Sequence, residues 1–94
     1  SFEALLKELF IYHLIDVKSD DTIYKKTAFY DEFAPSTQKI INKFVDERLL
    51  VSKSKDEKVI IEIAHESIIT DWKLLQEWIN EEKEFLLFRN QLNL

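Results

Sequence analysis

The hydrophobic pattern changes its period once within residues 59–78, VIIEIAHESIITDWKLLQEW. Over 59–64 the side chains alternate with a period of two, which is typical of a strand. From Ile68 onward apolar residues recur at intervals of three or four, which predicts an amphipathic helix burying one face. A strand therefore passes directly into a helix, and His65, Glu66 and Ser67 occupy the first turn of that helix.

This predicted first turn is a candidate anion site. Backbone N–H groups there lack intrahelical partners, and the helix dipole favours negative charge. The imidazole of His65 is able to donate a further hydrogen bond. A structural interpretation competes, because polar residues at helix starts commonly bond to the neighbouring backbone. The other histidine, His13, lies near the apolar side of a predicted first helix and is interpreted as structural.

Apolar spacing and turn residues predict the other elements. A first helix is expected over 2–14, a polar stretch over 16–21, a short strand over 22–26 and a brief helix over 28–33. Pro35 marks a boundary, and Ser36 or Thr37 is the expected N-cap of the next helix. The predicted buried stripe of that helix, which spans 36–50, is Ile40, Ile41, Phe44, Val45 and Leu49.

Two extended segments, 50–54 and 58–64, predict a hairpin around residues 55–57. A helix-turn-helix completed by a small antiparallel sheet is the winged-helix arrangement. The predicted fold class is therefore mainly α with a small antiparallel β-hairpin. This architecture serves DNA readers, docking modules and regulatory domains alike, so it does not by itself specify a function.

Composition limits what the chain can do alone. Ninety-four residues make one small domain, predicted over 1–94. The absence of methionine and the start at Ser1 favour a fragment of a larger multidomain protein, with 80–94 as a possible inter-domain helix. The lack of cysteine excludes disulfides and thiolate zinc sites, and no apolar run approaches the length of a membrane span. A cytoplasmic setting without membrane contact is expected.

Catalysis within this chain is disfavoured. The sequence has no glycine, and the glycines of a P-loop let backbone N–H groups approach phosphate. ATP hydrolysis would need another domain, and no metal site or catalytic acid pair is expected. The formal net charge of −5 also disfavours nucleic acid as a partner.

Aromatic residues near the C-terminus are candidates for contact with adjoining domains. Trp72 aligns with the predicted core stripe, whereas Trp78 lies at its rim. The run 85–88, FLLF, places apolar groups around most of a helical turn, more than a small domain readily buries. Trp78, Phe85 and Phe88 are therefore candidates to pack against another domain. Two alternatives stay open: Trp78 packs at the rim of its own core, and the helix at 85–88 folds back over the first helix or forms a dimer contact.

Several short motifs together resemble the winged-helix domain of STAND-class P-loop NTPases, the NACHT and NB-ARC-like proteins that often carry WD-type repeats. The resemblance covers residues 44–86 and combines a helix end, a histidine motif, a hydrophobic pair and two tryptophans. Its residues are Asp46, Arg48, Leu49 and Leu50, then Ala64, His65 and Glu66, then Ile68 and Ile69, and finally Trp72 and Trp78.

The resemblance implies a regulatory, non-catalytic, nucleotide-sensing role. In related apoptosis and immune-receptor proteins, the matching histidine lies in a His-Asp motif and contacts the phosphates of ADP, which holds the molecule closed. By position His65 is that histidine, and Glu66 stands where those relatives have Asp. ADP or ATP with Mg would be bound by the parent protein and not by this domain alone. The implied partners are the NTPase core and C-terminal repeat domains of the same chain.

Two alternatives remain open. In a DNA-binding winged helix, the helix 36–50 would enter the major groove, with Gln38, Lys39, Asn42 and Lys43 as readers. Lysines of the wing, Lys53 among them, would contact the phosphate backbone, although acidic residues interrupt both surfaces. A protein-docking module is the other alternative, and it requires an exposed apolar patch near 85–88.

Overall fold

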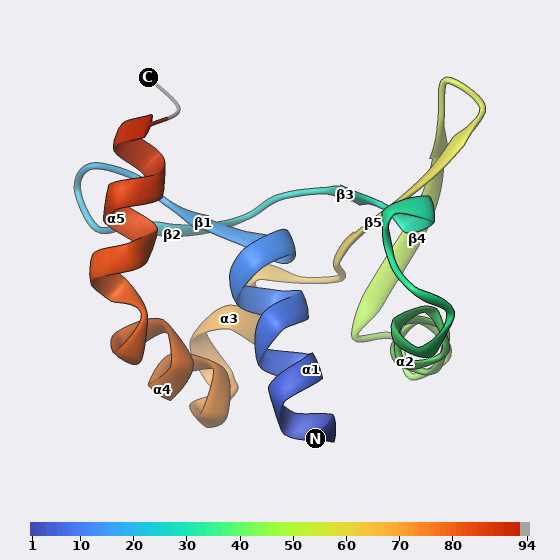
Figure 1. Ribbon diagram of the computed structural model, residues 1–94, viewed down its shortest axis with the longest axis horizontal. Coiled ribbons are helices and arrows are strands. Elements are labelled where there is room, and N and C mark those ends of the chain that lie inside the picture. Colours follow the sequence, from blue (N-terminus) through green and yellow to red (C-terminus); the bar gives the residue numbers. More distant parts are fainter. Residues whose placement is uncertain (93–94) are drawn as a thin grey trace.

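A computed structural model describes residues 1–92 of the chain as a mainly helical fold with two small antiparallel sheets, which confirms the predicted fold class. In Figure 1, α1, α3, α4 and α5 gather around the β1–β2 ribbon, while α2 lies beside the β4–β5 hairpin. The order of α2 followed by a hairpin is compatible with a winged-helix-like arrangement. The elements are α1 (Phe2–Glu8), η1 (Leu9–Leu14), β1 (Ile15–Val17), β2 (Ile23–Lys25), β3 (Ala28–Phe29), η2 (Tyr30–Glu32), α2 (Pro35–Asp46), β4 (Leu50–Lys55), β5 (Lys58–Ile63), α3 (Glu66–Asp71), α4 (Lys73–Glu81) and α5 (Lys83–Leu92).

The predicted first helix is present over 2–14, but its second half is a π-helix. Three consecutive residues at its start, Leu9, Phe10 and Ile11, are all buried, as is Leu14. A π-helix has more residues per turn than an α-helix, so consecutive side chains cover a narrower arc. The wider turn therefore lets all of these residues face one core.

The polar stretch after this helix begins later than predicted. Ile15, Asp16 and Val17 form β1, which pairs antiparallel with β2 and is buried along its whole length. Buried Asp16 is compensated by Arg89, whose guanidinium donates to its Oδ1 at 3.4 Å and to the Ile15 carbonyl at 2.8 Å. Buried carboxylates require such pairing.

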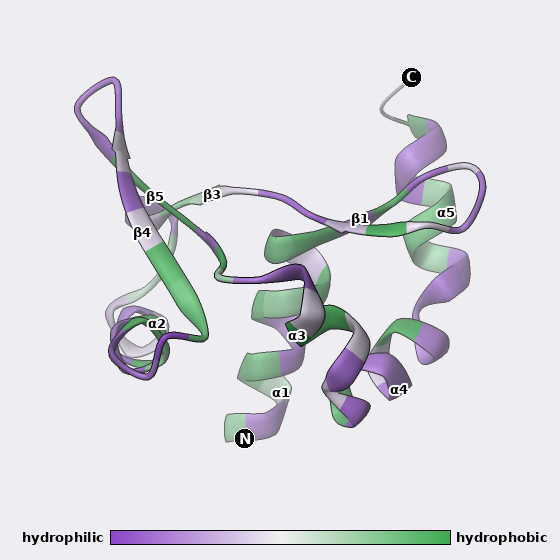
Figure 2. Ribbon diagram, turned by 180° about the vertical axis from the view of Figure 1, so that it is seen from behind, coloured by the Kyte–Doolittle hydropathy of each residue, from purple (hydrophilic) through white to green (hydrophobic). Residues whose placement is uncertain are grey.

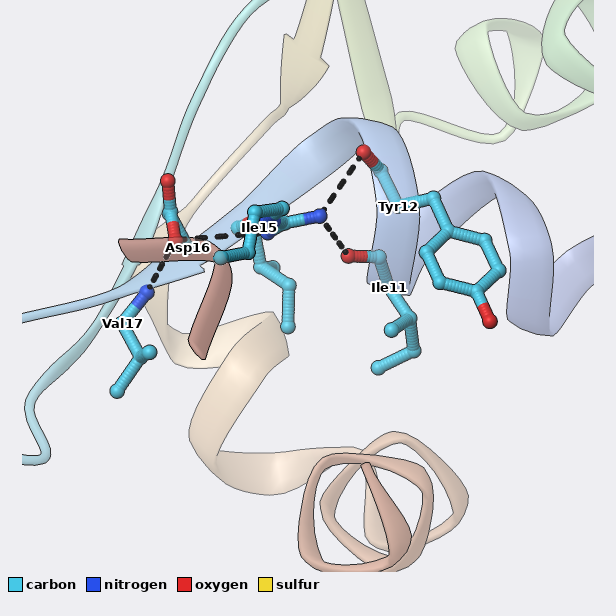
Figure 3. Close-up of polar contacts among 6 residues, drawn as sticks. Ile11, Tyr12, Ile15, Asp16 and Val17 are labelled. Carbon is cyan, nitrogen blue, oxygen red and sulfur yellow. Dashed lines mark hydrogen bonds and ion pairs between the residues drawn. The ribbon is translucent and has the colours of Figure 1, made fainter. Parts of the chain in front are cut away.

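Arg89 also holds the end of the π-helix. Its Nη1 donates to the carbonyl oxygens of Ile11 and Tyr12, each at 3.2 Å. These carbonyls and Asp16 surround the guanidinium in Figure 3. Carbonyls at a helix end have no intrahelical donor, so a cation there satisfies both their hydrogen bonding and the helix dipole. Arg89 therefore joins α5 to η1 and β1.

The helix predicted over 28–33 is wrong. Ala28 and Phe29 form the short strand β3, which pairs with Ile61 and Ile60 of β5, and a single 3₁₀ turn follows. A six-residue helix has little intrinsic stability, whereas β5 offers an open edge whose backbone groups need partners. Tertiary pairing therefore overrides the local pattern.

Helix α2 is confirmed, but its cap is not the predicted one. Ala34 is the N-cap and makes no side-chain hydrogen bond. Pro35 is the first residue of the helix, so Ser36 and Thr37 lie within its first turn and do not cap it. Proline is favoured at this position because its fixed φ suits a helix and its missing N–H is not needed. The helix stops before Arg48, whose φ is 65°, so Leu49 lies outside it and is 39% exposed instead of buried.

The predicted hairpin is confirmed, with Leu50 facing Ile63 at its base and Lys55 facing Lys58 at its tip. Figure 2 shows a hydrophobic base and a hydrophilic tip. The two turn residues, Asp56 and Glu57, have φ of 51° and 66°. Two consecutive positive φ values belong to the type I′ turn, which matches strand twist and favours Asn-Gly.

We therefore expect Glu57→Gly to stabilise the chain by about 0.5–1 kcal/mol, because glycine relieves the left-handed strain but adds unfolded-state entropy. Urea denaturation would show a higher midpoint with an unchanged slope. Lys55→Gly, two residues away in β4, is the matched control and is expected to destabilise by a similar amount. A lower midpoint for Glu57→Gly would contradict the positive φ at this residue.

The segment after His65 is helical, as predicted, but the helix predicted from Ile68 is interrupted. The backbone leaves helical geometry at Trp72 (φ −84°, ψ 102°) and at Glu82 (φ −105°, ψ 14°), which divides the segment into α3, α4 and α5. These breaks let separate apolar faces meet one core. Leu75 and Ile79 of α4 and Leu86 of α5 are buried in it.

The core is closed by an aromatic cluster. Trp72 packs edge-on against Phe10 and Trp78, with ring centroids 5.0 Å and 5.5 Å apart. Phe44 of α2 contacts Phe10 at 6.1 Å, so the cluster links α2 to the C-terminal helices. Trp72 is partly buried and packs against the core, as predicted. No helix among residues 1–92 is long and apolar enough to cross a membrane.

Candidate functional site

The strand-to-helix junction places His65 at the surface. Ile63 is buried at the end of β5, and the Ala64 N–H donates to the Leu49 carbonyl at 3.0 Å, which extends the ladder by one bond. His65 is then the N-cap of α3, and its side chain is exposed. The position of the histidine is therefore set by the hairpin on one side and by α3 on the other.

The hydrogen bond of His65 determines which ring nitrogen carries the proton. Its Nδ1 accepts from the Ser67 N–H at 3.2 Å, so Nδ1 has no proton in this arrangement. The neutral imidazole must then be protonated on Nε2. His65 consequently combines the two interpretations open at sequence level, because Nδ1 caps the helix while Nε2–H remains available to a ligand.

The helix contributes less to an anion site than the sequence predicted. Helix α3 has six residues, and one of its free N–H groups, that of Ser67, is used by His65. A short helix has a small dipole. Glu66 lies exposed in the first turn, where its charge favours the helix but opposes an anion. His65 is thus the main donor of this site.

An ion-pair network supports the strand beneath the site. Glu62 is buried in β5, where Lys53 contacts one of its carboxylate oxygens and the Nζ of Lys25 lies 3.6 Å from the other. Lys25 also donates to the Ile63 carbonyl at 3.2 Å. The hydrogen bond from Lys53 is the largest cause that holds the pKa of Glu62 below its ordinary value of 4.5, and the charge of Lys25 adds to it.

This network predicts a pH dependence. Because the pKa of Glu62 is lower folded than unfolded, its stabilisation is present above pH 4.5 and is lost as pH falls through the folded-state pKa. We expect Glu62→Gln to flatten the fall in unfolding free energy as the pH drops below 4.5. The exposed Glu47→Gln is the control, and an equal flattening in both variants would contradict the assignment.

The alternative DNA-reading residues are largely engaged within the chain. Gln38 donates its side-chain amide to the Tyr30 carbonyl at 3.0 Å, and Asn42 accepts from the Tyr30 hydroxyl at 2.9 Å. Lys53 pairs with Glu62. Only Lys39 and Lys43 of the five candidates remain exposed without a partner among residues 1–92. This placement does not assemble a basic reading surface.

The predicted inter-domain residues separate into two groups. Trp78 is 4% exposed and belongs to the core of this domain, so the expectation that it faces another domain is corrected. Phe85 and Phe88 are exposed on α5, and Tyr12 packs edge-on against Phe85 at 5.1 Å. Exposed Leu92, one turn after Phe88, continues this face and was not among the predicted residues. We call this exposed apolar surface the α5 strip; it consists of Tyr12, Phe85, Phe88 and Leu92.

The inter-domain helix was predicted over 80–94, and its residues 93–94 lie outside the described part of the chain.

An apolar cleft of about 410 Å³, which no sequence pattern predicted, opens near the junction. Its walls come from η1, from the end of α2 and from α3, so no contiguous pattern marks it. The lining residues are Phe10, Phe44, Leu49, Ile68, Asp71 and Trp72.

The remaining histidine takes no part in the site. His13 is partly buried and packs edge-on against Phe33 at 4.9 Å. Burial lowers its pKa and therefore favours the neutral form. Within residues 1–92, no group of three or more His, Cys, Asp or Glu side chains is arranged to hold a metal ion.

The family comparison agrees with the motif resemblance at the level of the STAND NTPases. A family model described as Novel STAND NTPase 1 matches residues 2–94, which includes the hairpin, His65 and α5. Searches of curated proteins and of solved structures each found no match. Because the match covers nearly the whole sequence, the chain belongs to the novel STAND NTPase 1 family.

Proposed function

We propose that this chain is a non-catalytic, nucleotide-sensing regulatory domain of winged-helix type within a larger STAND NTPase. His65 donates its Nε2–H to a phosphate oxygen of ADP held by a neighbouring nucleotide-binding core and thereby stabilises the closed state. The observation that carries this proposal is the tautomer of His65, whose Nδ1 is occupied by Ser67 and whose exposed side chain presents Nε2–H. Family membership supplies the NTPase context.

The nucleotide itself belongs to the core and not to this domain. The sequence has no glycine from which a P-loop could be built, so ADP or ATP with its Mg would be held by other residues of the parent. Glu66 supports the first turn of α3 and so helps to hold the His65 ring. Exchange of ADP for ATP, drawn from the cytoplasmic pool, would release the domain.

The α5 strip provides the contact with adjoining domains in this proposal. Phe88 is 58% and Leu92 70% exposed, and both project from a helix that is anchored by Arg89. Exposed aromatic and aliphatic groups of this size favour burial in an interface. The NTPase core or the C-terminal repeats of the parent are the partners we propose for it.

The test is ADP affinity of the parent NTPase, measured by calorimetry for wild type, His65→Ala and His65→Asn. Loss of one hydrogen bond to a charged phosphate is expected to weaken ADP binding about tenfold, or about 1.4 kcal/mol. Asparagine is a good N-cap, so His65→Asn keeps α3 capped while it removes Nε2–H. Equal losses in both variants would support a phosphate contact.

Other outcomes have distinct meanings. A loss in His65→Ala alone would assign His65 to capping, because only that variant lacks a side-chain acceptor for Ser67. Unchanged affinity in both variants would exclude nucleotide sensing. The α5 strip would then favour the second candidate function, a protein-docking module.

A further inference from the structure

The apolar cleft has a rigid aromatic floor. Phe10 is fully buried beneath it, and the edge-on contact between Phe10 and Trp72 fixes both rings. Leu49 and Ile68 add aliphatic groups to the lining. Because the lining comes from η1, from α2 and the residues that follow it, and from α3 and its end, the cleft is held by the tertiary structure and does not depend on one loop.

The cleft leaves apolar groups in contact with water. Five of its six lining residues are apolar, and its volume of about 410 Å³ lies near the lower end of the range for binding pockets. Each Å² of apolar surface left in contact with water costs about 25 cal/mol of free energy relative to the same surface when it is buried. An apolar side chain inserted from a partner would remove that cost.

The negative charge at the cleft favours a partner that carries a positive charge. Asp71 is the one charged residue of the lining, and its carboxylate accepts the Thr70 hydroxyl at 3.2 Å but makes no ion pair within residues 1–92. The net charge of the chain, −5, acts in the same direction. A cationic group beside the inserted apolar one therefore complements this surface.

The cleft adjoins the residues around His65. The Leu49 carbonyl accepts from Ala64, and the Ile68 N–H donates to the His65 carbonyl at 3.1 Å. Two wall residues are thus bonded to the backbone that carries the histidine. Any segment that fills the cleft would lie close to the junction of β5 and α3.

We propose that this cleft is a docking site for a protein segment that inserts one aromatic or leucine side chain and sets a lysine or arginine against Asp71. The segment is amphipathic, with its apolar face toward Trp72 and its cation at the rim. This binding is independent of the proposed nucleotide contact, since it uses neither the Nε2–H of His65 nor a nucleotide.

The experiment uses two blocked helical peptides of alanine and glutamine that carry one central phenylalanine, flanked by lysines in one peptide and by glutamates in the other. Each is titrated into the uniformly ¹⁵N-labelled 94-residue chain. We expect the lysine peptide to shift the Trp72 indole N–H and the amides of Leu49 and Ile68. Its affinity should exceed that of the glutamate peptide by at least about fivefold, a modest preference for one exposed ion pair.

Matched variants complete the test. Asp71→Asn keeps the shape of the side chain and should bring the two peptides to within about twofold of each other. Replacing the phenylalanine of the lysine peptide by alanine should abolish the shifts. The proposal is overturned by equal binding of both peptides to the wild type, by shifts confined to the α5 strip, or by 2-phenylethylammonium binding as tightly as the lysine peptide.

Discussion

Arg89→Ala is expected to lower the free energy of unfolding by about 3 kcal/mol, because it leaves a buried carboxylate without its cation. Asp16 is buried, and the guanidinium also satisfies the carbonyls of Ile11, Tyr12 and Ile15. A small domain has only about 5–15 kcal/mol of stability in total. Chemical denaturation followed by circular dichroism measures the loss directly.

Two variants separate the contribution of the planar guanidinium of Arg89, with its several N–H donors, from that of a positive charge alone. Arg89→Lys keeps the cation but cannot reach Asp16 and the carbonyls together, so an intermediate loss is expected. Lys83→Ala, on the same helix, removes a solvent-exposed ion pair with Asp21 at 3.2 Å and should cost less than about 1 kcal/mol. Equal losses for Arg89→Ala and Lys83→Ala would show that the buried network contributes no special stability.

Trp78→Ala is expected to destabilise the isolated chain by roughly 4 kcal/mol, since it opens a cavity among buried side chains. Trp78 is nearly inaccessible and contacts the Trp72 ring edge-on. The same denaturation measurement applies, and loss of the near-ultraviolet signal of the tryptophan pair gives a second readout.

Phe88→Ala is the matched control for an exposed aromatic residue of the α5 strip. Its removal should change the stability of the isolated chain by less than about 0.5 kcal/mol, as for most surface substitutions. An equally mild effect of Trp78→Ala would contradict the assignment of Trp78 to the core.

Sequence periodicity predicted the parts of the fold in which local pattern and tertiary packing agree. The helical spacing over 36–46 places one face of α2 against the core, and the two extended segments pair as a hairpin, so both elements are predicted correctly. The alternation over 59–64 does not correspond to one buried face, because residues 60–63 are all buried in β5 and Val59 is exposed. His65 was located correctly at the surface junction, because the period changes beside it. Its role as a nucleotide ligand stays a prediction.

Long-range contacts determined the parts that periodicity missed. Residues 28–29 join a sheet because β5 has an unpaired edge, which no local pattern reveals. The helix breaks at Trp72 and Glu82 follow from the positions of buried residues on three separate faces. The cleft likewise combines residues from distant segments.

Arg89 and Asp16 carried a signal that was available in the sequence. An acid within the apolar run 14–17, LIDV, requires a cation if the run is buried, and Arg89 directly follows the apolar run at 85–88. Their separation of 73 residues prevented a pairing from local reasoning. Once the fold brings α5 against β1, the partner is unambiguous.

The contact of Arg89 with η1 also bears on the order of events during synthesis. The first helix and β1 contain many of the buried side chains, yet the Ile11 and Tyr12 carbonyls and the buried Asp16 carboxylate depend for their cation on a residue up to 78 positions later. A ribosome therefore releases this apolar N-terminal segment well before its partner has been translated. Until α5 emerges, the nascent segment remains a substrate for chaperones that bind exposed hydrophobic chain.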